Sequence, residues 1–150
     1  MRGRRLLQSS MVAKRSDRTR SLPVGTFHVG ARIENVAERR KSASIPRLLV
    51  DTGSEYTWIP ETVLEKIGVK REKKDVAFVM ANGTRITRSV GFAVVHVAGT
   101  FTVDEVVFGE SGDLALLGAR SLEGLSLTVG PRRKRLVAAG PLPAASVRRL

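Results

Sequence analysis

Residues 48–60 read LLVDTGSEYTWIP, so an apolar run leads directly into Asp51 and a tight-turn sequence follows it. A carboxylate at the end of a buried strand costs free energy unless hydrogen-bond donors or a partner charge compensate it. Thr52 and Ser54 supply hydroxyl groups, and Gly53 allows a backbone conformation that most residues resist. Taken alone, these residue types also fit an ordinary exit from a strand into a turn.

The residues on either side of the turn distinguish between these two interpretations. Apolar residues before Asp-Thr-Gly-Ser, and Trp58-Ile59-Pro60 after it, resemble the active-site segment of aspartic proteases. Pepsin-like members carry two such motifs in a much longer chain, whereas this sequence has one motif and no internal repeat. It therefore resembles the retropepsin-like (clan AA) branch, in particular the small bacterial retroviral-type aspartyl proteases. The resemblance runs from about Val24 to about Leu142.

The resemblance implies an aspartic endopeptidase that is active as a homodimer, with Asp51 as the catalytic residue of each chain. Peptide hydrolysis needs one group to activate water and another to protonate the departing nitrogen. Two carboxylates about 3 Å apart resist double ionisation, share a proton and divide these roles. By position in the family motif, Thr52 would bond to the partner chain and the Gly53 carbonyl would contact substrate. Ser54 would hydrogen-bond the outer oxygen of Asp51.

A hairpin is predicted over residues 76–86, where two β-prone runs meet at Asn82-Gly83. Local sequence alone fits a plain surface hairpin, whereas the resemblance implies a flap that closes over bound peptide and excludes water. The resemblance assigns substrate contacts to Glu55 and to the hairpin residues Met80, Ala81, Asn82, Gly83 and Thr84.

Residues 114–125 contain two aliphatic residues and a glycine before a short amphipathic stretch. They resemble the element that packs behind the catalytic loop in this family, with Leu117 and Gly118 as its structural residues. Retropepsins often place Arg directly after that glycine, but here Ala119 comes first and Arg120 second. The buried ion pair of viral members is therefore not expected on this basis. A short helix packed on a sheet is the plainer interpretation.

The remaining pattern is mostly of strands. Residues 26–34 alternate strictly, which predicts a half-buried strand with Ile33 facing inward and Glu34 facing outward. Short strands separated by turn signals predict an all-β fold: a small closed retropepsin-like β-barrel with a flap hairpin and one or two short helices. The other predicted segments are a loop at 38–44, a buried strand at 47–51, a helix at 60–67, a solvated loop at 70–75, and strands at 89–97 and 101–108 around a turn at 98–99.

The net charge of +12 lies entirely at the two ends of the chain. Residues 1–20 hold seven Lys/Arg and one Asp, and residues 131–150 hold six Lys/Arg and no acid, so the middle is neutral. We expect a disordered basic segment at 1–20, a protease domain at 21–142 and a basic tail at 143–150. The basic run after Val129 fits a solvated turn before a short strand, although a nucleic-acid patch is the alternative.

No disulfide or thiolate metal site is possible, because the chain has no cysteine. His28 and His96 lack metal-ligand spacing and are predicted to be surface residues, so neither a metal nor another cofactor is expected. No apolar run is long enough to span a membrane, and we expect a cytoplasmic protein without a membrane partner.

Two other functions stay open at this point. A catalytically silent dimer of the same fold would serve as a peptide-binding or interaction module. A β-barrel that acts through its basic ends would associate with nucleic acid, but the neutral centre and the few aromatic residues argue against this partner.

Overall fold

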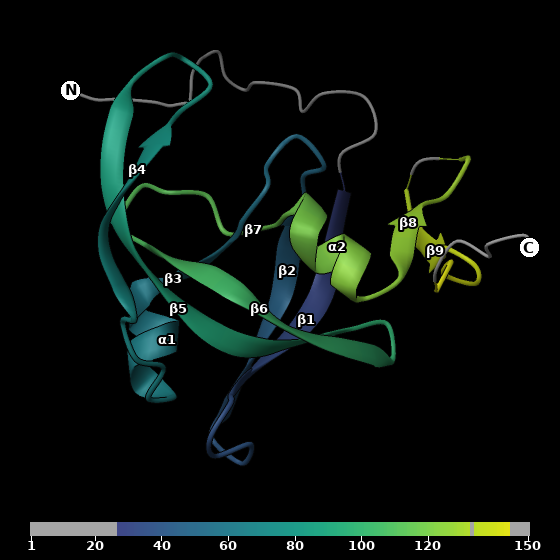
Figure 1. Ribbon diagram of the computed structural model, residues 1–150, viewed down its shortest axis with the longest axis horizontal. Coiled ribbons are helices and arrows are strands. Elements are labelled where there is room, and N and C mark those ends of the chain that lie inside the picture. The colour runs from purple at the N-terminus through teal and green to yellow at the C-terminus, as the bar shows by residue number, and fades with distance from the viewer. Residues whose placement is uncertain (1–26, 133, 145–150) are drawn as a thin grey trace, which may run out of the picture.

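A computed structural model describes residues 27–132 and 134–144 of the chain (Figure 1). The predicted segment 1–20 and most of the predicted tail 143–150 lie outside the described residues. The elements in chain order are β1 (Phe27–Asn35), β2 (Ser42–Val50), β3 (Thr57–Pro60), α1 (Glu61–Lys66), β4 (Lys73–Val79), β5 (Arg85–Val97), β6 (Thr100–Gly109), β7 (Leu116–Leu117), α2 (Ala119–Gly124), β8 (Leu127–Val129) and β9 (Leu136–Ala138). No helix among them is long and apolar enough to cross a membrane.

Seven strands form one sheet in the order β1-β2-β7-β3-β6-β5-β4, and β1 also pairs with β5. The sheet therefore closes into a ring, while β4 lies outside it and pairs with β5. The remaining strands, β8 and β9, form a separate two-stranded sheet. The predicted all-β class with two short helices is confirmed.

Strand β5 is long enough to belong to both the ring and the β4–β5 hairpin. Residues 93–96 pair with β1, whereas residues 85–88 and Val90 pair with β4. Residues 90–97 pair with β6 throughout. The first part of β5 therefore extends beyond the ring and carries β4 with it, which gives the projecting hairpin at the upper left of Figure 1.

Both predicted turns next to β5 are present. Ala98 and Gly99 have φ angles of 52° and 79°, so a two-residue turn joins β5 to β6. In the turn of the β4–β5 hairpin, between Val79 and Arg85, only Gly83 has a positive φ, of 85°. Asn82 instead accepts a hydrogen bond of 2.9 Å from the Thr84 N–H through its side-chain oxygen. The Asn-Gly pair therefore makes the turn with one left-handed residue rather than two.

Two predicted loops are partly wrong. The loop expected at 38–44 ends earlier, because β2 begins at Ser42 and pairs with Glu34 of β1. The loop expected at 70–75 gives way to β4 at Lys73. In both places, pairing with a neighbouring strand overrides a composition of small and charged residues that favours a loop.

Glu34, predicted to face outward, is only 3% exposed. It forms ion pairs with Arg32 and Arg39, and His96 Nε2 lies 3.0 Å from Glu34 Oε1. Burial raises the pKa of Glu34, but the hydrogen bond from Arg39 and the nearby positive charge outweigh it and lower the pKa overall. These partners explain why a carboxylate is tolerated inside. His96 is thus partly buried rather than on the surface, whereas His28 is exposed as predicted.

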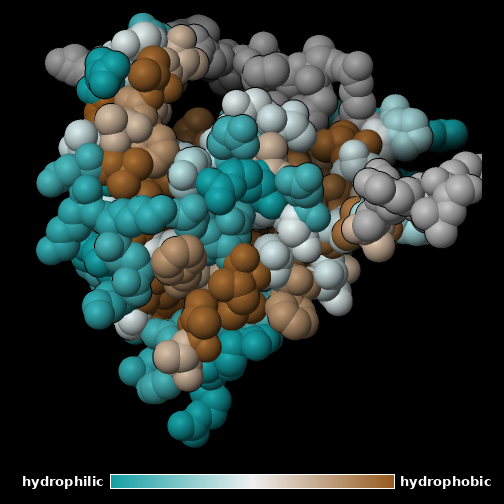
Figure 2. Space-filling view, viewed as in Figure 1, coloured by the Kyte–Doolittle hydropathy of each residue, from teal (hydrophilic) through white to brown (hydrophobic). Residues whose placement is uncertain are grey.

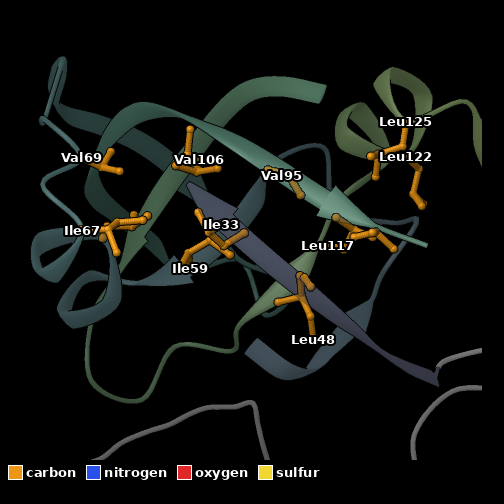
Figure 3. Close-up of a cluster of buried hydrophobic side chains, with 14 of the residues drawn as sticks. Ile33, Leu48, Ile59, Ile67, Val69, Val95, Val106, Leu117, Leu122 and Leu125 are labelled. Carbon is orange, nitrogen blue, oxygen red and sulfur yellow. The ribbon is translucent and has the colours of Figure 1, made fainter. Parts of the chain in front are cut away.

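The main core fills the ring (Figure 3). Ile67 and Val69, which follow α1, lie at one end of the view, and Leu122 and Leu125 from α2 lie at the other. All four are buried. The two short helices therefore close opposite ends of the core.

Apolar side chains also gather on the outer face of β5 and β6 (Figure 2). Phe92, Phe101 and Val103 are 43–54% exposed there, and the pairing of β5 with β6 places them on neighbouring strands. Water therefore reaches part of an apolar sheet surface on this side of the molecule.

Candidate active site

Asp51 lies at the carboxyl end of β2, directly after the buried residues Leu48, Leu49 and Val50. β2 pairs in parallel with β7, and this pairing continues as the Asp51 N–H donates to the Leu117 carbonyl over 3.0 Å. The Asp51 side chain is partly exposed. The carboxylate therefore lies at the end of a buried strand, as predicted, and it still reaches solvent.

The turn after Asp51 holds one oxygen of its carboxylate. The Gly53 N–H donates to Asp51 Oδ1 over 3.0 Å, and the Ser54 N–H donates to the Asp51 carbonyl over 3.2 Å. The Ser54 hydroxyl donates to the Tyr56 carbonyl over 2.9 Å, so the predicted bond from Ser54 to Asp51 is wrong. A backbone donor, rather than the serine side chain, orients the carboxylate.

Thr52, Gly53 and Glu55 are exposed on this turn. Within the part of the chain that the structure describes, the Thr52 hydroxyl makes no hydrogen bond, so its predicted bond to a second chain stays a prediction. The turn is well placed for such contacts, because it projects from the ring at the same edge as the β4–β5 hairpin (Figure 1).

β7 and α2 support the turn from behind, as expected for Leu117 and Gly118. The Ala119 N–H donates to the Ser54 carbonyl over 2.7 Å, and the Arg120 N–H donates to the Glu55 carbonyl over 3.1 Å. At Gly118 a Cβ atom would lie 2.3 Å from the Tyr56 carbonyl oxygen. Glycine is therefore required for this close approach of the two backbones.

The hairpin predicted as a flap packs on the segment that follows Asp51. The ring of Phe78 in β4 lies 5.4 Å from that of Tyr56 and 5.1 Å from that of Trp58. Met80 is partly buried. The remaining hairpin residues predicted to contact substrate, Ala81, Asn82, Gly83 and Thr84, are exposed at the tip.

A second apolar cluster lies between this hairpin and the strands beneath it. Its buried members are Leu49, Trp58, Val90, Val107 and Leu116, and Tyr56, Val76, Phe78, Met80 and Ile86 pack against them. The cluster joins the hairpin to the end of β2 that carries Asp51. The structure thus brings together the two regions that were predicted to form one site.

The contacts of several residues around the site were not predicted from the sequence. Thr57 and Ser121 are fully buried, and they hydrogen-bond to each other behind the turn. Arg120 lies over the Tyr56 ring, 4.8 Å from its centroid, and bonds to Glu105. Arg120 and Ser121 lie within the segment 114–125 noted in the sequence, but their contacts join residues far apart in the chain, so only the three-dimensional packing reveals them. Across residues 27–132 and 134–144, no group of three or more His, Cys, Asp or Glu side chains is placed to hold a metal ion.

The comparison with protein families fits this arrangement. A family described as gag-polyprotein putative aspartyl protease matches residues 43–124, which is more than half of the chain. The chain belongs to this aspartyl protease family. The match includes the Asp51 turn, the β4–β5 hairpin and the glycine at 118, and the structure of this protease domain is the all-β, retropepsin-like fold. No curated protein matches the chain.

Proposed function

We propose that this aspartyl protease is an endopeptidase active as a homodimer, in which Asp51 and the partner's Asp51 activate a water molecule. One observation carries the proposal: the carboxylate of Asp51 ends a core strand, is held by the Gly53 N–H and remains partly exposed. A carboxylate that served only to close a turn would not need the buried support of β7 and α2 behind it.

The chemistry requires a second carboxylate. A single Asp51 side chain cannot be charged, to activate water, and neutral, to protonate the departing nitrogen, in the same step. The sequence has one Asp-Thr-Gly motif, so the second carboxylate comes from a second copy of the chain. A two-fold axis next to the exposed turn would place the two side chains face to face, where they share one proton.

The β4–β5 hairpin then acts as a flap over bound peptide. Its tip is exposed, while Phe78 packs on Tyr56 and Trp58 near the turn. Movement of the hairpin therefore changes this apolar contact. Closure of the hairpin would remove water from around the carboxylates. The substrate would be a peptide in extended form, bound between the hairpin and the turn.

A digest of a peptide library by the wild type and by Asp51→Asn tests this function at several pH values. The expected result is cleavage by the wild type and none by Asp51→Asn, with both proteins dimeric in sedimentation. Asp75→Asn is the matched control, because Asp75 is exposed and its φ of 55° suits asparagine equally well. A dimer that binds peptides without cutting them would instead support a silent interaction module.

A further inference from the structure

Arg120 holds the segment that follows the catalytic turn through its backbone and its side chain. Its N–H donates to the Glu55 carbonyl over 3.1 Å. Its guanidinium lies over the Tyr56 ring, 4.8 Å from the centroid, and Nη2 lies 3.1 Å from Glu105 Oε1. An arginine one position later than the family pattern therefore reaches a carboxylate on β6.

The other oxygen of Glu105 bonds to the hairpin. Lys73 Nζ lies 2.7 Å from Glu105 Oε2, and Lys73 is the first residue of β4. The Glu105 side chain is 13% exposed, whereas those of Lys73 and Arg120 are 55% and 40% exposed. The hydrogen bond from Lys73, and then that from Arg120, lower the pKa of Glu105 against the opposing effect of its burial. Glu105 thus stays ionised between two cations.

A second contact joins the same two parts of the molecule. The Tyr56 ring, which Arg120 covers, meets Phe78 of β4 edge to face at 5.4 Å. Strand β4 therefore contacts the segment next to the Asp51 turn at two places: through Lys73 at its start and through Phe78 near its end. Lys73 reaches Arg120 through Glu105, and Phe78 reaches it through Tyr56.

We propose that Glu105 is a positioning residue of this site, which holds the β4–β5 hairpin and the catalytic turn in one relative placement by bridging Lys73 and Arg120. The proposal rests on the proposed function, because it assigns the hairpin a role in binding peptide. Without the bridge, a smaller fraction of molecules has the hairpin in its packed position. The apparent affinity for peptide falls in proportion to that fraction. The Asp51 carboxylate is untouched, so the effect is on KM rather than on kcat.

The size and salt dependence of the effect follow from the exposure of the two cations. Ion pairs with exposed partners contribute little free energy. We therefore expect Glu105→Gln to raise KM only about two- to fivefold at low salt. Ionic strength screens such pairs. The KM of the wild type should therefore rise with salt and approach that of Glu105→Gln.

The test compares Glu105→Gln with Glu123→Gln, which removes the same charge from an exposed residue of α2. Lys73→Met, which keeps the aliphatic stem, and the Lys73→Met/Glu105→Gln double variant complete the set. Two quantities are measured at low and high salt: the KM and kcat for a cleaved peptide, and amide hydrogen exchange over residues 73–79. Exchange reports on the hairpin even if no peptide is cut.

The expected result is a higher KM with unchanged kcat, and faster exchange over residues 73–79, in Glu105→Gln and in Lys73→Met. The double variant should be no worse than either single change, and Glu123→Gln should match the wild type. Equal behaviour of the two glutamine variants, or a fall in kcat alone, would overturn the positioning role. Loss of all cleavage in the wild type would contradict the proposed function, and exchange would then decide whether Glu105 holds the hairpin.

Discussion

Thr57 and Ser121 lie 64 positions apart in the chain, and their hydroxyl oxygens are 2.6 Å apart in the interior. The Ser121 hydroxyl donates to Asp104 Oδ2 over 2.8 Å, so its single proton is used there. Thr57 must therefore donate to Ser121. Thr57 in turn accepts the Gly118 N–H over 3.0 Å. One chain of hydrogen bonds thus connects β3, α2 and β6 behind the turn that follows Asp51.

Replacing Thr57 with valine should leave the buried Gly118 N–H without an acceptor. We expect Thr57→Val to lower the free energy of unfolding by about 2 kcal/mol, the typical penalty for one buried group without a partner. Urea denaturation measures this change. Thr128→Val, at an exposed position of β8, is the control and should have little effect. Equal stability of the two variants would show that the chain of hydrogen bonds does not contribute to the free energy of unfolding.

Gly118→Ala should damage both stability and the site. The added Cβ would lie 2.3 Å from the Tyr56 carbonyl oxygen, so the backbone of the turn must move. We expect a loss of about 3 kcal/mol in the free energy of unfolding and a strong loss of peptide cleavage. At Gly30 a Cβ would lie 3.8 Å from the nearest other atom, so Gly30→Ala is the control. A Gly118→Ala protein as stable and active as this control would refute the close approach.

Glu34 should make stability depend on pH. Its pKa is lowered from the ordinary value of 4.5 in the folded protein, so its contribution is present above that value and is lost as the pH falls through the lowered pKa. Glu34→Gln should therefore be less stable by about 1–2 kcal/mol at pH 7, and the difference should shrink in acid. Thermal unfolding between pH 7 and pH 3 measures it. Glu38→Gln, at an exposed position, is the control. A stability difference between the wild type and Glu34→Gln that stays constant with pH would contradict the lowered pKa of Glu34.

The sequence allowed the secondary structure to be predicted where one physical signal dominates. The alternation in residues 27–33 gave the core face of β1, and Pro60 and Gly68 bracketed α1 correctly. Residue composition gave wrong predictions where contacts with other parts of the fold determine the local structure. Ser42 joins a strand because β1 supplies its hydrogen bonds, and Glu34 is buried because Arg32, Arg39 and His96 surround it.

The same limit applies to the site. The Asp51 motif, the hairpin and Gly118 are local patterns, and each was found in the sequence at the position where the structure has it. Arg120, Glu105 and Lys73 come from three separate elements. Each would pass for an ordinary surface charge in the sequence, so only the fold shows that they contact one another.

The most direct test of the account is the activity of mixed dimers. Wild-type chains are mixed with an equal amount of Asp51→Asn chains under conditions that allow exchange, and peptide cleavage per wild-type chain is measured. If each site needs Asp51 from both chains, only dimers of two wild-type chains are active, and cleavage per wild-type chain should fall to about half. An undiminished rate per wild-type chain would contradict the shared site.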